Sequence, residues 1–131
     1  LTEAKAGLGA VGDYVGLEVN MRPAGGYTMD MTNFAHSTDV YEIWADMITA
    51  NRRLLPDCGV HCCCAYAGRR DFHRYVHTHE EILSRYADSI VMCERLPEVM
   101  WPQMGNQMYM AKLRDQEETD AFIRFVQERV K

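Results

Sequence analysis

The run from Gly16 to Pro23 contains residue types that suit a metal-bound polyphosphate. Glu18, Asn20 and Arg22 stand at every second position of this run. A carboxylate and an amide carbonyl are hard oxygen ligands for Mg²⁺, which proteins usually hold through one or two such groups plus substrate phosphates. A guanidinium can bind phosphate oxygens through two parallel hydrogen bonds. On one surface, the three side chains would form one edge of a site for Mg²⁺ (or Mn²⁺) and ATP.

The element that would position these side chains is a strand over residues 14–21. Polar and apolar residues alternate there, and the apolar ones that share a face are Val15, Leu17, Val19 and Met21. Same-face neighbours on a strand lie roughly 6.5 Å apart, so Glu18, Asn20 and Arg22 would project in a row. Pro23 ends the ladder because it has no N–H to donate. Spacing alone favours a plain surface strand with a polar face, and the metal site is the alternative.

A family resemblance favours the metal site. The run Glu18-Val19-Asn20-Met21-Arg22-Pro23, with Gly25-Gly26-Tyr27-Thr28-Met29-Asp30 after it, resembles the second metal-binding strand and following loop of the ATP-grasp superfamily. Biotin carboxylase, the large subunit of carbamoyl phosphate synthetase and the purine-pathway ATP-grasp carboxylases share a similar strand. The specific match covers about residues 13–50, whereas residues 60–131 resemble the biotin-carboxylase-type C-terminal subdomain only in arrangement.

The resemblance implies a ligase. Such an enzyme uses ATP to phosphorylate a carboxylate or bicarbonate, and an amine or thiol then attacks the acyl-phosphate intermediate. It implies that Glu18 and Asn20 bind the metal and that Arg22, a catalytic residue, lies near the transferred phosphate. Gly25 and Gly26 complete the cofactor-binding set, with either their backbone N–H groups near an anion or a plain glycine turn.

The identity of the acid is left open. Biotin carboxylase has Gln and Glu close to the places of Gly25 and Gly26, so its bicarbonate site does not carry over to this sequence. Asp30 and Asn33 are further candidates for lining the pocket, although such residues more often cap a helix or face solvent. A small-molecule carboxylate is therefore the expected substrate class.

Much of an ATP-grasp site is expected to come from other sequence. The phosphate-binding lysines, the adenine hinge and the first metal carboxylate belong to earlier lobes, and no candidate strand precedes Tyr14. Because the chain begins at Leu1 without an initiator Met, we expect a piece of a longer protein that is inactive alone. The N-terminal ATP-grasp lobes of the parent are its expected partner. The alternative is a non-catalytic, ATP-grasp-derived module for packing or partner binding.

The sequence predicts an α+β fold in two units. Residues 1–56 would be the C-terminal part of an ATP-grasp domain and residues 57–131 a small α/β subdomain, with the boundary at Pro56-Asp57-Cys58-Gly59. Ser37 or Thr38 is expected to cap a helix, and residues 68–71 to form a turn. Mixed or antiparallel strands are predicted over residues 14–21, 60–67, 90–96 and 107–113, and helices over 28–35, over 38–51, after a capping box at Thr78 to Glu81, and after Asp115.

Three further groups of reactive or charged residues have simpler interpretations. The five Cys include the run Cys62-Cys63-Cys64 after His61, which with Cys58 could bind zinc, but small buried thiols in a strand fit better. His73, His77 and His79 could form a ligand cluster, although a helix start explains their surroundings. Arg69 and Arg70 could bind a substrate anion, but a solvated turn is favoured.

Composition limits the class of protein. Hydrophobic content of 47% and charged content of 25% over 131 residues are typical of a soluble globular protein. The net charge of −5 disfavours nucleic acid as a partner, because an acidic chain repels phosphate backbones. The sequence has no apolar run of about 20 residues and no signal peptide pattern, so neither a membrane nor secretion is expected. A cytoplasmic protein, with a homo-oligomer as a possible assembly, is the resulting expectation.

Overall fold

The computed structural model describes residues 2–4, 6–16, 24–56 and 61–130. These residues form an α+β fold with one antiparallel sheet. The helices are α1 (Thr28–His36), α2 (Val40–Ala50), α3 (His79–Arg85), α4 (Trp101–Met104) and α5 (Gln116–Gln127), with a 3₁₀ turn η1 at Glu98–Met100. The strands are β1 (Cys63–Arg69), β2 (Ile90–Arg95) and β3 (Gln107–Leu113).

The sheet has the strand order β1-β3-β2, so the last strand in the chain lies in the centre. Cys63 pairs with Leu113 at one end of β1, and Arg69 pairs with Gln107 at the other. Gln107 also pairs with Arg95 of β2, and an irregularity in β2 falls between Ile90 and Met92. The central strand is therefore the most buried, in keeping with its run of apolar residues.

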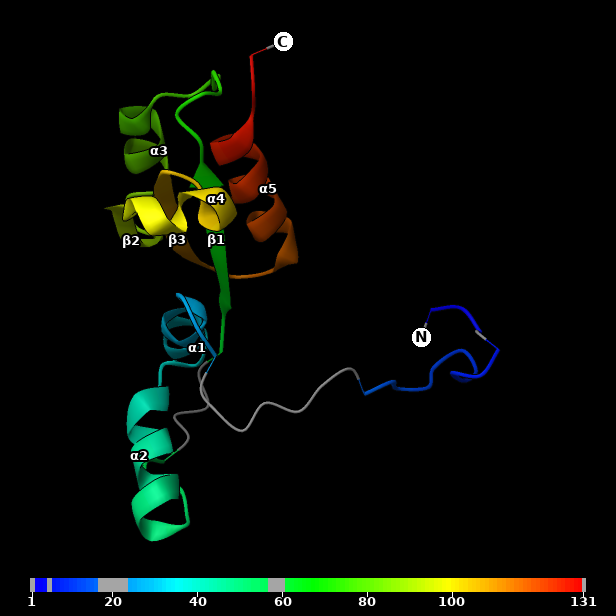
Figure 1. The fold of residues 1–131 in the computed structure, drawn as a ribbon. Coiled ribbons are helices and arrows are strands. Elements are labelled where there is room, and N and C mark those ends of the chain that lie inside the picture. The colour runs from blue at the N-terminus through cyan, green and yellow to red at the C-terminus, as the bar shows by residue number, and fades with distance from the viewer. Residues whose placement is uncertain (1, 5, 17–23, 57–60, 131) are drawn as a thin grey trace.

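Helices cover both faces of the sheet, giving three layers (Figure 1). On one face, α3 and α5 place Ile82, Phe122 and Val126 against a core that includes Tyr109. On the other face, α1 and α4 pack a layer rich in methionine, whose members include Met31, Phe34, Met92, Met100, Met104, Met108 and Met110. The alternation of side chains along each strand produces these two different cores.

Local signals predicted several elements correctly. Thr78 and Glu81 form the reciprocal capping box at the start of α3, and the Asp115 carboxylate accepts the Glu118 N–H at 2.9 Å to cap α5. The cap of α2 was predicted wrongly. Asp39 accepts the N–H groups of Tyr41 and Glu42, whereas Ser37 has a left-handed backbone that ends α1.

Two strand predictions differ from the structure. Tyr14 to Gly16 are not in a strand, and no neighbouring strand among the described residues offers them a ladder; residues 17–21 of the predicted strand lie outside the described residues. β1 begins at Cys63 and continues through Gly68 and Arg69, so the turn predicted over residues 68–71 is displaced: it lies over residues 70–73, where the His73 N–H donates to the Arg70 carbonyl at 3.0 Å. Pairing with β3 keeps this glycine-arginine step extended, overriding its turn-like composition.

α2 carries an apolar stripe at helical spacing that the described residues leave uncovered. Trp44, Met47 and Ile48 are 39%, 45% and 68% exposed, and α2 buries no residue. α2 projects away from the sheet beyond α1 (Figure 1). In α5, Phe122 and Val126 are buried, whereas Val130 lies past the end of the helix and is exposed.

The first unit of the predicted division contributes α1 directly to the sheet. Phe34 packs in the methionine-rich core, and the Cys62 N–H donates to the Ala35 carbonyl at 2.8 Å. The predicted boundary at Pro56 continues into residues 57–60, which lie outside the described residues. None of the helices formed by the described residues combines the length and the apolar character needed to cross a bilayer.

Candidate functional site

Most of the predicted metal and nucleotide residues lie outside the described residues. Glu18, Asn20 and Arg22 fall in residues 17–23, outside the described residues. Gly25 and Gly26 are described and exposed, and Gly26 has a left-handed backbone with φ of 62°. Glycine adopts that conformation without the steric cost that a side chain brings.

The loop at Gly25 and Gly26, the glycine loop, is connected to the sheet by the residues that follow it. A Cβ built on Gly26 would lie 4.0 Å from the Met104 sulfur, an ordinary van der Waals contact. The Tyr27 ring stacks on Tyr66 of β1 with the ring centroids 6.4 Å apart, and its hydroxyl donates to Glu94 of β2 at 3.0 Å. These contacts hold the end of the loop beside α4 and the sheet.

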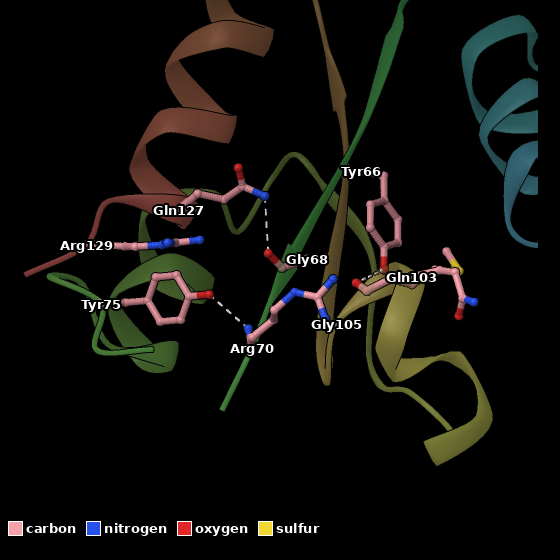
Figure 2. Close-up of a pocket in the computed structure, with 9 residues that line it drawn as sticks. Tyr66, Gly68, Arg70, Tyr75, Gln103, Gly105, Gln127 and Arg129 are labelled. Atoms are coloured by element: carbon pink, nitrogen blue, oxygen red, sulfur yellow. Dashed lines mark hydrogen bonds between the residues drawn. The ribbon is translucent and has the colours of Figure 1, made fainter. Parts of the chain in front are cut away.

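A pocket of about 210 Å³ adjoins this loop at Met104 (Figure 2). Three separate parts of the chain line it: the end of β1 with the following turn, the end of α4, and the end of α5. The lining residues are Tyr66, Gly68, Arg70, Tyr75, Gln103, Met104, Gly105, Gln127 and Arg129. Its polar lining is made of guanidinium, amide and phenol groups.

Two glycines allow α4 to approach β1. A Cβ on Gly68 would lie 2.3 Å from the Met104 carbonyl oxygen, and one on Gly105 would lie 2.6 Å from the Arg69 carbonyl oxygen. Gly105 also has a φ of 91°, which disfavours a side chain. The Tyr66 hydroxyl donates to the same Met104 carbonyl at 2.9 Å and closes this corner of the pocket.

Arg70 is fixed by carbonyl groups rather than by an acid. Its guanidinium donates to the carbonyls of Trp101 at 2.8 Å and Pro102 at 2.9 Å, and its backbone N–H donates to the Tyr75 hydroxyl at 2.8 Å. Among the described carboxylates, none forms an ion pair with Arg70 or Arg129. The pocket therefore holds two positive charges that the described acids leave uncompensated.

The remaining polar groups orient the pocket. The Gln127 amide donates to the Gly68 carbonyl at 3.2 Å (Figure 2). The backbones of Tyr75 and Arg129 form a bridge. Burial raises the pKa of Tyr66, Tyr27 raises it further, and Arg70 opposes them. The Tyr66 phenol is therefore a hydrogen-bond donor at neutral pH. No carboxylate, thiol or imidazole occurs among the described residues lining this pocket, so the arrangement suits binding of an anion rather than proton transfer.

The cysteine and histidine candidates do not gather into a metal site. Within the described ranges, no three His, Cys, Asp or Glu side chains lie close enough to hold a metal ion. Cys62, Cys63 and Cys64 are partly buried free thiols, and Cys58 lies outside the described residues. Burial raises the pKa of Cys64 to about 11, so that thiol is protonated at neutral pH.

Each histidine of the predicted cluster has its own neighbour. His77 stacks on Phe125 with ring centroids 3.6 Å apart and lies 3.0 Å from the Glu128 carboxylate. Nδ1 of His79 is hydrogen-bonded to the Tyr109 hydroxyl at 2.8 Å. The His73 ring packs against the rings of Phe72 and Tyr75.

Asn33 accepts backbone hydrogen bonds at a helix end, in keeping with the capping role considered for it from the sequence. Its side-chain oxygen accepts the Val40 N–H at 2.7 Å, and its carbonyl accepts the Thr38 N–H at 3.2 Å. These bonds join the end of α1 to the start of α2. Asp30 lies on α1 and is partly buried.

Sequence reasoning missed most of the pocket. Gln103, Gln127 and Arg129 were not singled out, because they are single polar residues in separate segments. The favoured interpretation of Arg69 and Arg70 as a solvated turn is wrong for Arg69, which is 8% exposed. The nearest local signal was the pair Gly68 and Gly105, which marks a close backbone approach.

Comparison with known proteins gives no relative: no family model, no curated protein and no solved structure matches this chain.

Proposed function

We propose that this chain is the C-terminal part of an ATP-grasp ligase of the carbamoyl-phosphate-synthase and biotin-carboxylase type. It would contribute a strand for Mg²⁺ and ATP and a binding pocket for the carboxylate that the enzyme activates. One observation carries the proposal. The run Glu18-Val19-Asn20-Met21-Arg22 leads within a few residues to Gly26, where an added Cβ would lie 4.0 Å from the Met104 sulfur at the edge of a pocket containing Arg70 and Arg129.

The donor set fits the metal-nucleotide group. Glu18 supplies an anionic oxygen and Asn20 a neutral oxygen, which is the ligand type that Mg²⁺ prefers. Arg22 supplies a charge-assisted donor for phosphate oxygens and would stabilise negative charge where phosphate is transferred. Bound Mg²⁺ would neutralise charge on the triphosphate. Gly25 and Gly26 leave the backbone open to close approach by an anion.

The pocket fits the other substrate. Guanidinium groups bind a carboxylate strongly, and Arg70 is held in place by the Trp101 and Pro102 carbonyls before any substrate arrives. A volume of about 210 Å³ suits a small acid. Because the described lining residues include no carboxylate, thiol or imidazole, activation of the acid would depend on the nucleotide and metal held by Glu18, Asn20 and Arg22.

A direct test uses Mn²⁺ as a paramagnetic substitute for Mg²⁺. Mn²⁺ with ATP should broaden the backbone amide signals of Gly25 and Gly26 in the NMR spectrum of the chain. Glu18→Gln should lower the affinity for Mn²⁺ by about tenfold or more. Loss of a partner that only orients a metal ligand already costs about tenfold in metal affinity, and Glu18 is proposed as a ligand itself. The matched control is Glu42→Gln, an exposed acid at the start of α2. Equal broadening in both variants would contradict the proposal.

A second test concerns turnover. The 131-residue chain is expected to be inactive alone, since the phosphate-binding lysines and first metal carboxylate of an ATP-grasp enzyme must come from other lobes. In a longer protein that supplies them, Glu18→Ala should abolish ATP-dependent turnover and leave the fold intact. Unchanged turnover would exclude Glu18 from the metal site.

The second candidate is a non-catalytic module derived from an ATP-grasp domain. The observation that favours it is the exposed apolar face of α2, with Trp44, Met47 and Ile48 uncovered by the described residues. Such a face suits packing against another protein surface. The sequence encoded upstream of Leu1 distinguishes the candidates: a glycine-rich loop with phosphate-binding lysines supports the ligase, and its absence supports the module.

A further inference from the structure

Arg69 carries a buried guanidinium at the end of β1. Its side chain is directed to the α3/α5 face of the sheet, because alternate strand residues share a face and Ala65 and Ala67 lie in that core. Nε donates to the Val126 carbonyl at 2.6 Å, and Nη1 donates to the His77 carbonyl at 2.7 Å. Arg69 therefore joins three segments of the fold.

The second terminal nitrogen of Arg69 is different. Nη2 is buried and has no hydrogen-bond partner among the described residues. The guanidinium carbon lies 4.5 Å from the centre of the Tyr75 ring and 5.9 Å from that of Tyr109. Ring faces compensate part of the charge, but they leave the N–H groups of Nη2 without an oxygen acceptor. A buried charged donor in this state indicates a missing acceptor.

Arg69 is one of the residues that line a neighbouring pocket of about 380 Å³. Arg95 and Gln107 line it from the sheet, and His73 and His79 line it from the segment before and at the start of α3. It shares Arg70 and Tyr75 with the pocket of Figure 2, but its other lining residues differ, because Tyr66 of that pocket belongs to the opposite face of the sheet.

The charge of this second pocket favours an anion. Arg69, Arg70 and Arg95 bring positive charge to the lining, whereas Asp71 is the one carboxylate among the described lining residues. Arg95 already donates to Asp71 at 2.7 Å, so that acid is compensated. The Arg70 guanidinium is held by the Trp101 and Pro102 carbonyls, so the positive charge that this lining leaves without an acid is mainly that of Arg69.

A tyrosine-histidine pair adds a further donor. The Tyr109 hydroxyl lies 2.8 Å from Nδ1 of His79. Burial raises the pKa of Tyr109 to about 12, so its proton is retained at neutral pH. When Tyr109 donates to Nδ1, the neutral imidazole keeps its proton on Nε2; when Nδ1 donates to Tyr109, the phenol proton is released for another acceptor. Either arrangement leaves one donor for a ligand.

We propose that this pocket binds a small oxyanion, a carboxylate or phosphate group, which accepts hydrogen bonds from Arg69 Nη2 and from the Tyr109–His79 pair. An oxygen acceptor would complete the hydrogen bonding of the buried guanidinium, and an anion would balance the net charge of the lining. The site needs neither Glu18 nor a nucleotide, so it extends beyond the ligase proposal and stands independently of it.

The test titrates the chain with sodium phosphate and with sodium acetate, and uses sodium chloride at matched ionic strength as the control. The Nε–H signal of Arg69 in the NMR spectrum reports binding, because this buried group is distinct from exposed arginines. Phosphate or acetate should shift that signal in a saturable manner, and chloride should not. Response to phosphate alone would identify a phosphoryl ligand, and response to acetate alone a carboxylate.

Tyr109→Phe is the informative variant, because it keeps the ring and removes the hydroxyl. It should weaken anion binding about tenfold, as expected for loss of one charge-assisted hydrogen bond. Tyr86→Phe is the matched control, since Tyr86 packs on the same core but does not line this pocket. Equal affinity in the two variants would overturn the proposal. An Arg69 signal unmoved by either anion at about 0.1 M, where exposed charges are already strongly screened, would also overturn it.

A further variant separates this proposal from the ligase. Glu18→Gln should bind the oxyanion as the unmodified chain does, even where it loses the effect of Mn²⁺ and ATP. Loss of Mn²⁺ and ATP binding with retained anion binding supports both proposals. If only anion binding fails, the proposed metal site at Glu18 and Asn20 still stands and only the oxyanion site is excluded.

Discussion

The α-carbon of Gly68 lies so close to the Met104 carbonyl oxygen that a Cβ at Gly68 would be 2.3 Å from it. The obstructing atom belongs to the backbone, which cannot rotate away as a flexible side chain can. We predict that Gly68→Ala lowers the free energy of unfolding by about 1–3 kcal/mol, the usual cost of overpacking. Urea denaturation measures this. Gly16→Ala is the control, because nothing lies within 4 Å of that position. An equal effect of both substitutions would show that α4 does not approach β1.

The capping box of α3 gives a second prediction. The Thr78 hydroxyl accepts the Glu81 N–H at 3.2 Å, and the Glu81 carboxylate accepts the Thr78 N–H at 2.7 Å. Thr78→Ala removes one of these bonds and should lower the free energy of unfolding by about 1 kcal/mol. Ser84→Ala, an exposed hydroxyl deletion in the same helix, should leave stability unchanged or slightly higher. Thermal unfolding of the two variants compares the effects.

Cys64 should react slowly with alkylating agents. Burial is the main cause that raises its pKa from the ordinary value of 9.0 to about 11, and this lowers the thiolate fraction about a hundredfold near pH 8. The alkylation rate of Cys64 in the folded chain should therefore be about a hundredfold below its rate in the urea-unfolded chain. Peptide mapping by mass spectrometry measures each cysteine separately. Similar rates in both states would contradict the burial of this thiol.

The same raised pKa predicts a loss of stability in alkali. The unfolded chain releases the Cys64 proton near pH 9, whereas the folded chain holds it until about pH 11. Stabilisation from this thiol is therefore complete below pH 9 and is lost as the pH rises through 11. Cys64→Ser should make the unfolding midpoint less dependent on pH in that window. An unchanged pH dependence would show that the thiol titrates alike in both states.

The pair of Asp71 and Arg95 predicts a pH dependence at the acid end. The hydrogen bond from Arg95 is the main cause that lowers the pKa of Asp71. Its stabilisation is present above the unfolded pKa of about 3.9 and is lost as the pH falls through the lower folded pKa. Because the Asp71 side chain is 52% exposed, solvent screening keeps the effect small.

Asp71→Asn should therefore lower the thermal midpoint slightly at pH 7 and leave it unchanged near pH 2. The control is Asp88→Asn, an exposed acid in the turn after α3. A loss of equal size at both pH values would attribute the effect to packing rather than to the ion pair.

Short-range chemistry made much of the α3 to α5 region predictable from sequence. The Thr78 box, the Asp115 cap and the apolar run from Met108 to Leu113 act through neighbours within a few positions. The predicted start of β1 and the predicted cap of α2 were misplaced, because more than one neighbouring residue at each place is suited to begin the strand or to cap the helix. Asp39 was available immediately after the two capping candidates that composition favoured.

The burial of Arg69 could not be predicted by such reasoning. Its acceptor on Val126 lies 57 residues further along the chain, and only the packing of α5 against β1 brings them together. The pocket around Arg70 has the same origin, because Gln103 and Arg129 come from distant segments. The residues with the strongest sequence pattern, Glu18, Asn20 and Arg22, remain a prediction.

The two faces of the sheet differ in mechanical character. On the α1 side, six methionines, Met31, Met92, Met100, Met104, Met108 and Met110, fill the space between the helices and the strands. Unbranched thioether chains rearrange by bond rotation, so this layer yields to small displacements more readily than the aliphatic and aromatic layer beneath α5. The glycine loop adjoins this methionine-rich layer at Met104. Oxidation of these sulfurs to sulfoxides would make the layer polar and loosen its packing, whereas the described members of the opposite core include no methionine.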